Sequence, residues 1–224
     1  MKKITIAILF LFSTISLASA DLGINVGASA SLGVFHADGK ETIDHTAGSD
    51  EIKKENATGV AGYTSFFIEK TLGPYLSVGY DYVPDTLSTD TVENTRCDNN
   101  TNPAQKGSCG SGTSAANTVQ IDFNDLTTYY ATLNIGDVYF KYGMMEVDVV
   151  TNENLPTGSS YGNTSLDGTM YGVGYNKTFD NTIFIRGEAM MLDFDSAKMT
   201  SDDNTIELNN LEGAMGKISI GKSF

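Results

Sequence analysis

The sequence predicts an all-β protein, a single antiparallel transmembrane β-barrel of eight strands that follows an N-terminal signal peptide. Three observations predict this fold. Apolar residues alternate with small or polar ones in eight segments, the pattern of strands with one face in lipid. Four long polar connections alternate with three short ones, as in bacterial barrels. The last alternating segment ends the chain on an aromatic residue, Phe224.

The N-terminus carries the features of a secretory signal. A basic start precedes an apolar run over 4–12, and the small residues of 18–20 suit cleavage. The run is too short for a transmembrane helix, which needs about 20 apolar residues. No repeat or domain boundary interrupts the rest of the chain. We therefore expect a signal peptide over 1–20 and one barrel domain over 21–224.

Composition supports an ordered and strongly acidic mature protein. Without the two lysines of the signal, 12 basic residues stand against 28 acidic ones, which is a net charge of −16. This surplus of negative charge excludes a nucleic-acid partner. Disorder is the simplest alternative for so acidic a chain, but 40% hydrophobic residues with 11 Tyr and 11 Phe argue against it.

The first three expected strands show the alternation most clearly. Over 22–34, seven apolar residues alternate with glycine, serine or asparagine. A second alternating stretch covers 59–69, and the short turn 70–74 leads into a third strand over 75–83. Pro84 ends that strand, because proline has no backbone N–H to donate to a strand ladder.

The later strands follow the same period of two. Apolar residues share one parity over each of 119–135, 168–179 and 182–193, and the closing strand lies within 206–224. The short turn 136–137 joins the fourth strand to the fifth. Each of these segments is therefore expected to place one face in lipid.

Two choices exist for which face of the fifth strand, 138–148, points to lipid. If Val138 and Phe140 face lipid, Lys141 points into the barrel. The opposite parity would place Lys141 against lipid, which costs about 2 to 4 kcal/mol at the bilayer midplane. We therefore predict that Lys141 points inward.

Four polar segments without apolar periodicity, at 36–58, 84–117, 151–167 and 195–205, are expected to form long outer loops. A hairpin hidden within 85–117 would instead make a barrel of ten strands.

The chain has two cysteines, Cys97 and Cys109, and both lie in the second polar segment. An exported protein meets an oxidising compartment, so we predict that they form a disulfide. Closing a loop of this size stabilises the fold by about 3 kcal/mol in the chain-entropy model.

The strand parity places six charged residues in the barrel interior. They are Glu69, Asp81, Lys141, Arg186, Glu188 and Lys217. Eight strands leave an interior just wide enough for side chains to fill. Three acids and three bases in that space predict a plug of salt bridges. The alternative is a narrow or gated ion path through the same charges.

Over about 21–224, the chain resembles the small Gram-negative outer-membrane barrels of the OmpA-like, opacity and porin-like kind. The signal peptide, the eight alternating segments, the GDVYFKYG stretch at 136–143 and the terminal strand carry the resemblance. It implies an outer-membrane location with periplasmic termini and extracellular loops. It also implies contact with membrane lipid and lipopolysaccharide.

In that group the closing strand with its terminal aromatic resembles the signal that the barrel-assembly machinery reads. The resemblance implies that Ile218, Ile220 and Phe224 form this signal here. Lys222 departs from the pattern because it has lipid-facing parity. A lysine so close to the chain end can extend its ammonium to the interface.

Two loop features could carry further chemistry. His36 and His45 are the only histidines and lie among acids, so a lipid-active enzyme could use one of them with a serine and an acid. Solvated loop histidines are the simpler interpretation. The acidic loop clusters could hold divalent cations through oxygen ligands, although none has the regular calcium-loop spacing.

The sequence thus favours a non-enzymatic, cofactor-free barrel with an envelope-structural or recognition role. A porin-like channel for small solutes or cations is the alternative, and a lipid-active enzyme is a third hypothesis.

Overall fold

The computed structural model describes residues 22–43, 50–97, 114–154, 160–179, 182–201 and 204–224. Eleven strands in these ranges pair into one sheet. They are β1 (Ile24–Ile43), β2 (Glu51–Leu72), β3 (Leu76–Tyr82), β4 (Leu87–Ser88), β5 (Val92–Cys97), β6 (Ser114–Ile135), β7 (Val138–Asn154), β8 (Thr164–Thr178), β9 (Ile183–Phe194), β10 (Ala197–Ser201) and β11 (Asn204–Ser223).

Eight of these strands close into a ring. The order is β1, β2, β3, β6, β7, β8, β9 and β11, and β11 pairs with β1 to complete the barrel. All pairings are antiparallel. The prediction of an all-β barrel with eight strands is confirmed.

The ten-stranded alternative is wrong, although the segment 84–117 does contain two short strands. β3 pairs with residues 127–133 of β6, β4 with 122–123, and β5 with 114–119. β3, β4 and β5 therefore pair one after another with the same strand, β6, and the two short strands do not enlarge the ring.

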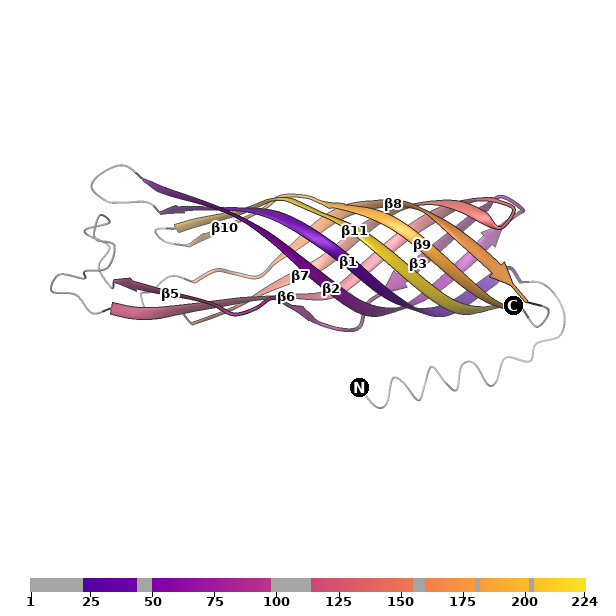
Figure 1. Ribbon diagram of the computed structural model, residues 1–224, viewed down its shortest axis with the longest axis horizontal. Helices are drawn as coiled ribbons and strands as arrows, with labels where there is room; N and C mark the ends of the chain where they lie inside the picture. The colour runs from indigo at the N-terminus through magenta and orange to yellow at the C-terminus, as the bar shows by residue number, and fades with distance from the viewer. Residues whose placement is uncertain (1–21, 44–49, 98–113, 155–159, 180–181, 202–203) are drawn as a thin grey trace.

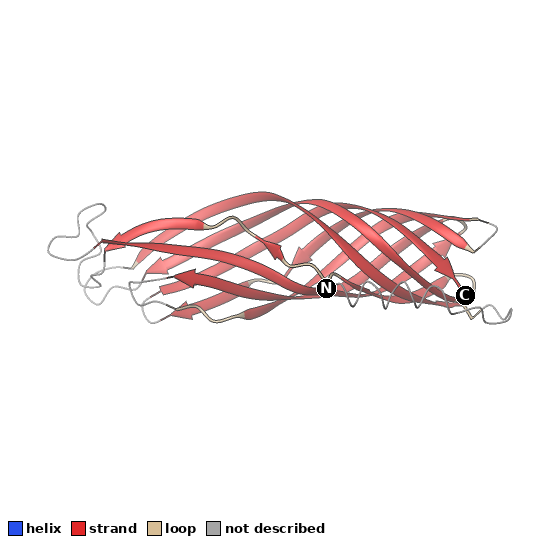
Figure 2. Cartoon of the chain, turned by 90° about the horizontal axis from the view of Figure 1, so that it is seen from below, coloured by secondary structure: helices blue, strands red, loops and turns tan. Residues whose placement is uncertain are grey.

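The barrel is elongated and its two ends differ. The turns after β2 and β6 lie at the end that also holds Phe224, on the right in Figure 1, and this end is called the turn end. Paired strands extend beyond the ring at the other end, called the loop end. Figure 2 shows strands inclined to the long axis, as closing a barrel requires.

The polar segments are not loops throughout, contrary to the sequence prediction. β1 continues to Ile43 and β2 begins at Glu51, so most of 36–58 is a paired hairpin. β10 and the start of β11 likewise occupy part of 195–205. Backbone hydrogen bonds between strands do not require apolar side chains, so strands that are polar on both faces give no hydropathy signal.

Outward-facing side chains form an apolar wall around the ring. Leu32, Val60 and Ile218 are each more than 60% exposed, and every ring strand carries exposed large hydrophobic side chains. A continuous exposed apolar surface of this extent fits contact with lipid. β7 has the predicted facing, with Val138 outward and Lys141 inward. No described helix is long and apolar enough to cross a membrane.

The parity of β6 changes along the strand, which the sequence analysis did not anticipate. The shared parity of apolar residues over 119–135 predicts that Phe123 and Tyr129 lie on the same face. A bulge at Asp125, whose φ is 53°, shifts the register between Asn124 and Thr127. Because a bulge inserts one extra residue, Phe123 packs against the interior cluster while Tyr129 faces outward.

Inward-facing aromatic side chains lie over glycines on the neighbouring strand. In six cross-strand pairs a Cβ added to the glycine would stand within 3 Å of the ring, which shows how closely each ring covers the backbone. The pairs are Gly27 with Phe67, Gly79 with Tyr130, Gly168 with Phe194, Gly174 with Tyr139, Gly213 with Phe35, and Gly221 with Phe184. This pairing lets bulky rings fill a narrow barrel.

Candidate functional site: the closed barrel interior

The strongest polar contact inside the barrel joins β2 to β9. The Arg186 guanidinium donates two hydrogen bonds to the Glu69 carboxylate, at 2.8 and 2.7 Å. Asn25 donates a third at 2.9 Å, and the Tyr130 hydroxyl lies 3.3 Å from the same carboxylate. Glu69 is 2% exposed. A bidentate pair with further donors compensates for burying the two charges.

The other four predicted charges form two more pairs. Lys141 of β7 donates to Glu188 of β9 at 2.9 Å, and Lys217 of β11 donates to Asp81 of β3 at 2.5 Å. All six charged side chains are buried, and each has an opposite partner. The structure thus brings together the whole predicted set as three ion pairs.

Aromatic rings hold two of the cations in place. The Lys141 ammonium lies 4.0 Å from the centre of the Tyr130 ring, and the Arg186 guanidinium lies 4.6 Å from that of Phe184. These are two of the rings that cover glycines. The attraction of a cation to a ring face adds to each ion pair and limits the motion of its side chain.

An apolar layer, which the sequence analysis missed, adjoins the ion pairs. Met145, Met170, Met190 and Met215 come from four consecutive ring strands and are all buried. Together with residues that include Tyr63, they enclose a residual cavity of about 10 Å³, which has room for one water molecule at most. The Tyr63 hydroxyl also donates to the Met215 sulfur at 2.8 Å.

This layer is part of a contiguous hydrophobic cluster that continues toward the loop end, through Leu166, Leu192 and Phe194. A sequence signal for it exists. The apolar residues of β7 change parity, from 138, 140, 142 and 144 to 145, 147 and 149, as expected of a strand whose apolar face turns from lipid to the interior. Methionine suits such a layer because its flexible side chain fills irregular gaps.

A polar vestibule of about 190 Å³ opens at the turn end and reaches the Arg186–Glu69 pair. Among its polar lining residues are Asn25, Thr71, Ser77, Thr132, Asn134 and Asn176. The Thr132 hydroxyl has no protein hydrogen-bond partner, so water suits this space. The interior thus runs from a polar vestibule through ion pairs to an apolar layer.

The residues of the expected assembly signal lie on the closing strand. Ile218 and Ile220 face outward, and both are more than half exposed. Phe224 exchanges two backbone hydrogen bonds with Ile24, at 2.8 and 3.2 Å. Lys222 extends to the end of the chain, where its ammonium lies 4.8 Å from the centre of the Phe224 ring.

The predicted disulfide lies partly outside the described residues. Cys97 ends β5, and Cys109 is not among the residues that the structure describes, so their pairing stays a prediction.

His36 contacts two polar residues beside the apolar wall. Its Nδ1 lies 3.2 Å from the Thr58 hydroxyl, and its Nε2 lies 3.3 Å from the Asp38 carboxylate. His45 falls outside the described residues. The residues that the structure describes contain no group of three or more His, Cys, Asp or Glu suited to a metal ion. Cation binding at the acidic loops therefore stays a prediction.

A row of three lysines crosses four strands beyond the ring at the loop end. This lysine row consists of Lys54 on β2, Lys40 on β1 and Lys198 on β10, with Glu207 of β11 between the last two. Glu207 accepts from Lys40 at 3.0 Å and lies 3.6 Å from Lys198. The hydrogen bond from Lys40 lowers the pKa of the Glu207 carboxyl below its ordinary value. Lys40 and Lys54 are direct cross-strand partners of like charge, which is unfavourable without a shared anion.

No protein-family model matches the sequence, and no curated protein matches it. Several solved structures match the fold. OprG from Pseudomonas aeruginosa, an outer membrane protein, aligns with a TM-score of 0.50 at 6% identity, over 92% of this chain and 99% of that chain. Neisserial surface protein A aligns at 0.41 and 11% identity, over 90% and 97%. The outer membrane protease OmpT from Escherichia coli aligns at 0.44 and 11%, over 95% and 100%. The chain has the fold of the small outer-membrane β-barrels of Gram-negative bacteria.

Proposed function

We propose that the protein is an integral outer-membrane barrel with a closed interior, which acts through its loop-end surface in envelope structure or recognition. The turn end and both termini then lie in the periplasm, and the extended hairpins lie outside the cell. The apolar wall, the short turns at one end and the long hairpins at the other support this orientation.

This proposal rests on one observation: two layers of side chains, the ion pairs and the methionine layer, close the interior. Ions would have to pass the three ion pairs, where each charge already has a partner, and then the methionine layer. An apolar constriction of this kind resists wetting, and an ion that enters it loses its hydration. Both obstacles stand in series, so we propose that the barrel does not conduct.

Conductance in planar lipid bilayers tests this proposal. The purified protein is expected to give no steady openings. Because the ion pairs remain when the methionine layer is opened, Met190→Ala with Met215→Ala is expected to produce openings only when Lys141→Ala and Glu188→Ala are added. Steady cation-selective openings of the unaltered protein, lost on Glu69→Gln or Asp81→Asn, would instead establish a channel. A barrel that migrates differently on a gel before and after boiling shows that each variant is folded.

The vestibule favours a second candidate function, a narrow gated channel. It brings solvent to the Arg186–Glu69 pair from the turn end, so the ion pairs and the hydrophobic cluster that includes the methionine layer separate it from the loop end. A channel of this kind would open by displacement of methionine side chains. The same recordings distinguish the two functions.

The lysine row supports a phosphorylated glycan, as in lipopolysaccharide, as the partner of the loop-end surface. A protein with such an acidic composition concentrates three outward lysines just beyond its apolar wall. Phosphate groups would relieve the repulsion between Lys40 and Lys54. Glu207 loses its charge only as the pH falls through its lowered pKa, so this binding should strengthen in acid.

Changing Lys40, Lys54 and Lys198 to Gln is expected to weaken binding to immobilised lipopolysaccharide about ten-fold at low salt, because each exposed lysine contributes about 1 kcal/mol or less to a contact with an anionic surface. Lys53→Gln is the matched control, since Lys53 is next to Lys54 but on the opposite face of β2, across from Glu41. If Lys53→Gln weakened the binding as much as the triple variant does, the lysine row would have no specific role.

We further propose that the protein is not an enzyme, and that His36 serves the hairpin rather than a reaction. His36→Gln with His45→Gln should leave the lipid A and phospholipid profile of the outer membrane unchanged. A reproducible change in acylation or deacylation products would establish the lipid-active alternative.

A further inference from the structure

The outer wall of the barrel is hollowed over β1, β8, β9 and β11. The groove has a volume of about 860 Å³, which lies within the usual range of small-molecule sites, about 300–1,000 Å³. Its floor is made of small outward residues that include Gly187, Ala189 and Gly216. A Cβ added to either glycine would meet no atom within 4 Å, so the hollow is open.

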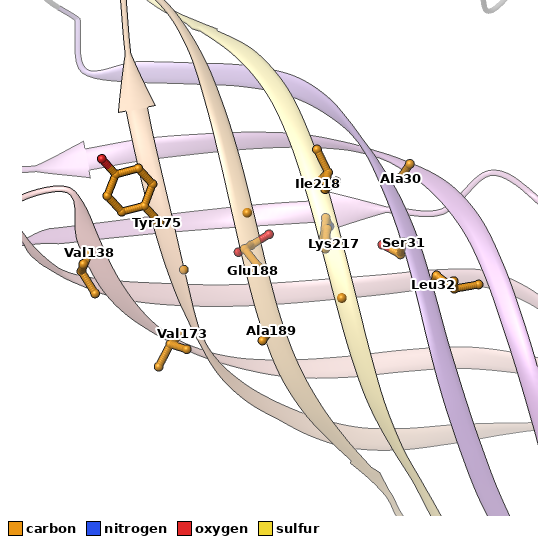
Figure 3. A pocket seen from close by; sticks show the side chains of 13 residues that line it. Ala30, Ser31, Leu32, Val138, Val173, Tyr175, Glu188, Ala189, Lys217 and Ile218 are labelled. Atoms are coloured by element: carbon orange, nitrogen blue, oxygen red, sulfur yellow. The ribbon is translucent and has the colours of Figure 1, made fainter.

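Large apolar side chains border this floor on both sides. Figure 3 shows Val173 and Tyr175 of β8 on one side, with Val138 beside them, and Leu32 and Ile218 on the other. The charged residues Glu188 and Lys217 belong to the ion pairs of the interior. The groove is therefore an apolar trough in the part of the wall that faces lipid.

Two lysines stand where the trough approaches the turn end. Lys177 follows Tyr175 by two residues on β8, and Lys222 follows Ile218 by four on β11, so both share the outward parity of the trough. A single strand, β9, separates them: Lys177 pairs with Ile185, and Lys222 pairs with Ile183. Both lie within two residues of the end of their strand, at the boundary between apolar wall and turn end.

We propose that the trough binds one anionic phospholipid, with its phosphate between Lys177 and Lys222 and its acyl chains on the glycine and alanine floor. Two ammonium groups on alternate strands can reach a single phosphate from both sides. The acyl chains would fill contacts that the absent side chains of Gly187 and Gly216 leave open.

A second outer groove provides a comparison. It has a volume of about 570 Å³ and lies over β2, β3, β6 and β7, where its only lysine is Lys70. The Lys70 ammonium already donates to the backbone oxygen of Leu22. Only the first groove therefore combines an apolar trough with a pair of cations.

A second copy of the chain fits the trough less well than a lipid does. In a two-fold dimer the same surface of each copy meets at the interface, at the same depth in the membrane. Lys177 and Lys222 of one copy would then face the same two lysines of the other without an intervening anion. Repulsion between these like charges favours the lipid.

Fluorescence quenching tests this proposal. The chain has no tryptophan, so Tyr175→Trp supplies a single reporter in the trough, and Leu133→Trp supplies a control on the outward face of β6, outside both grooves. The reporters are compared in vesicles that contain brominated phosphatidylglycerol or brominated phosphatidylcholine. We expect a preference of about three- to ten-fold for the anionic lipid at position 175 and none at position 133.

Added substitutions separate the parts of the site. Lys177→Gln with Lys222→Gln should reduce the preference at position 175 to about one, whereas Lys70→Gln should leave it unchanged. Ala189→Leu with Gly216→Leu should also abolish it by filling the trough. Equal quenching by the two lipids in the protein with all its lysines would overturn the proposal. So would a dimer in detergent that the filled trough converts to a monomer, because the occupant would then be a second copy.

Discussion

Arg186→Met is expected to lower the free energy of unfolding by about 3 to 5 kcal/mol, because it leaves the Glu69 carboxylate buried without its cation. The guanidinium supplies two of the hydrogen bonds to that carboxylate, at 2.7 and 2.8 Å. Asn25 and Tyr130 remain, but neither carries a positive charge. Denaturant unfolding in detergent micelles, with the gel shift on boiling as an independent measure of folding, gives the change.

The double variant Arg186→Met with Glu69→Gln isolates the cause. It removes both charges, so it should recover most of the lost stability, since a buried pair replaced by neutral residues is often tolerated. Lys40→Gln breaks the exposed pair with Glu207 and should have little effect. A double variant as unstable as Arg186→Met alone would show that packing of Arg186 against Phe184 matters more than its charge.

Strand parity explains why the sequence predicts which charges lie inside. Each of Glu69, Lys141 and Arg186 stands in a segment whose opposite parity is apolar, so a period of two is enough to turn it inward. The partners are not predictable in this way. Lys141 meets Glu188 of β9 across the barrel interior, past the intervening strand β8, and this contact depends on strand tilt and on the stagger of the ring.

The parts of the fold that sequence analysis missed have physical reasons of the same kind. Hydropathy cannot reveal the polar ends of β1 and β2, because their pairing rests on backbone hydrogen bonds. The bulge at Asp125 reverses the facing of Phe123 through one residue with positive φ, which leaves no trace in an alternating pattern. The methionine layer was missed because Met144 and Met145 are both apolar, so parity alone does not separate wall from interior.

Gly172 of β8 lies directly opposite the bulky Met190 of β9 and has no room for a side chain. Gly172→Ala is expected to destabilise the barrel by about 1 to 3 kcal/mol, in the range of overpacked cores. A Cβ at position 172 would stand 2.4 Å from the backbone oxygen of Ala189 and 2.6 Å from the Cγ of Met190. The backbone oxygen cannot move aside without distorting the pairing of β8 with β9, which holds the methionine layer closed.

Gly187→Ala is the matched control, because it makes the same change on the adjacent strand at an outward position where a Cβ meets nothing within 4 Å. It should alter the free energy of unfolding by no more than about 0.5 kcal/mol. Adding Met190→Ala to Gly172→Ala distinguishes the two contacts, since it removes the side chain but leaves the oxygen of Ala189 in place. The double variant is compared with Met190→Ala alone, because removing a buried methionine is itself destabilising. If the backbone contact dominates, Gly172→Ala destabilises the Met190→Ala protein as much as the unaltered protein. Loss of that effect would mean that the methionine side chain is what position 172 must accommodate.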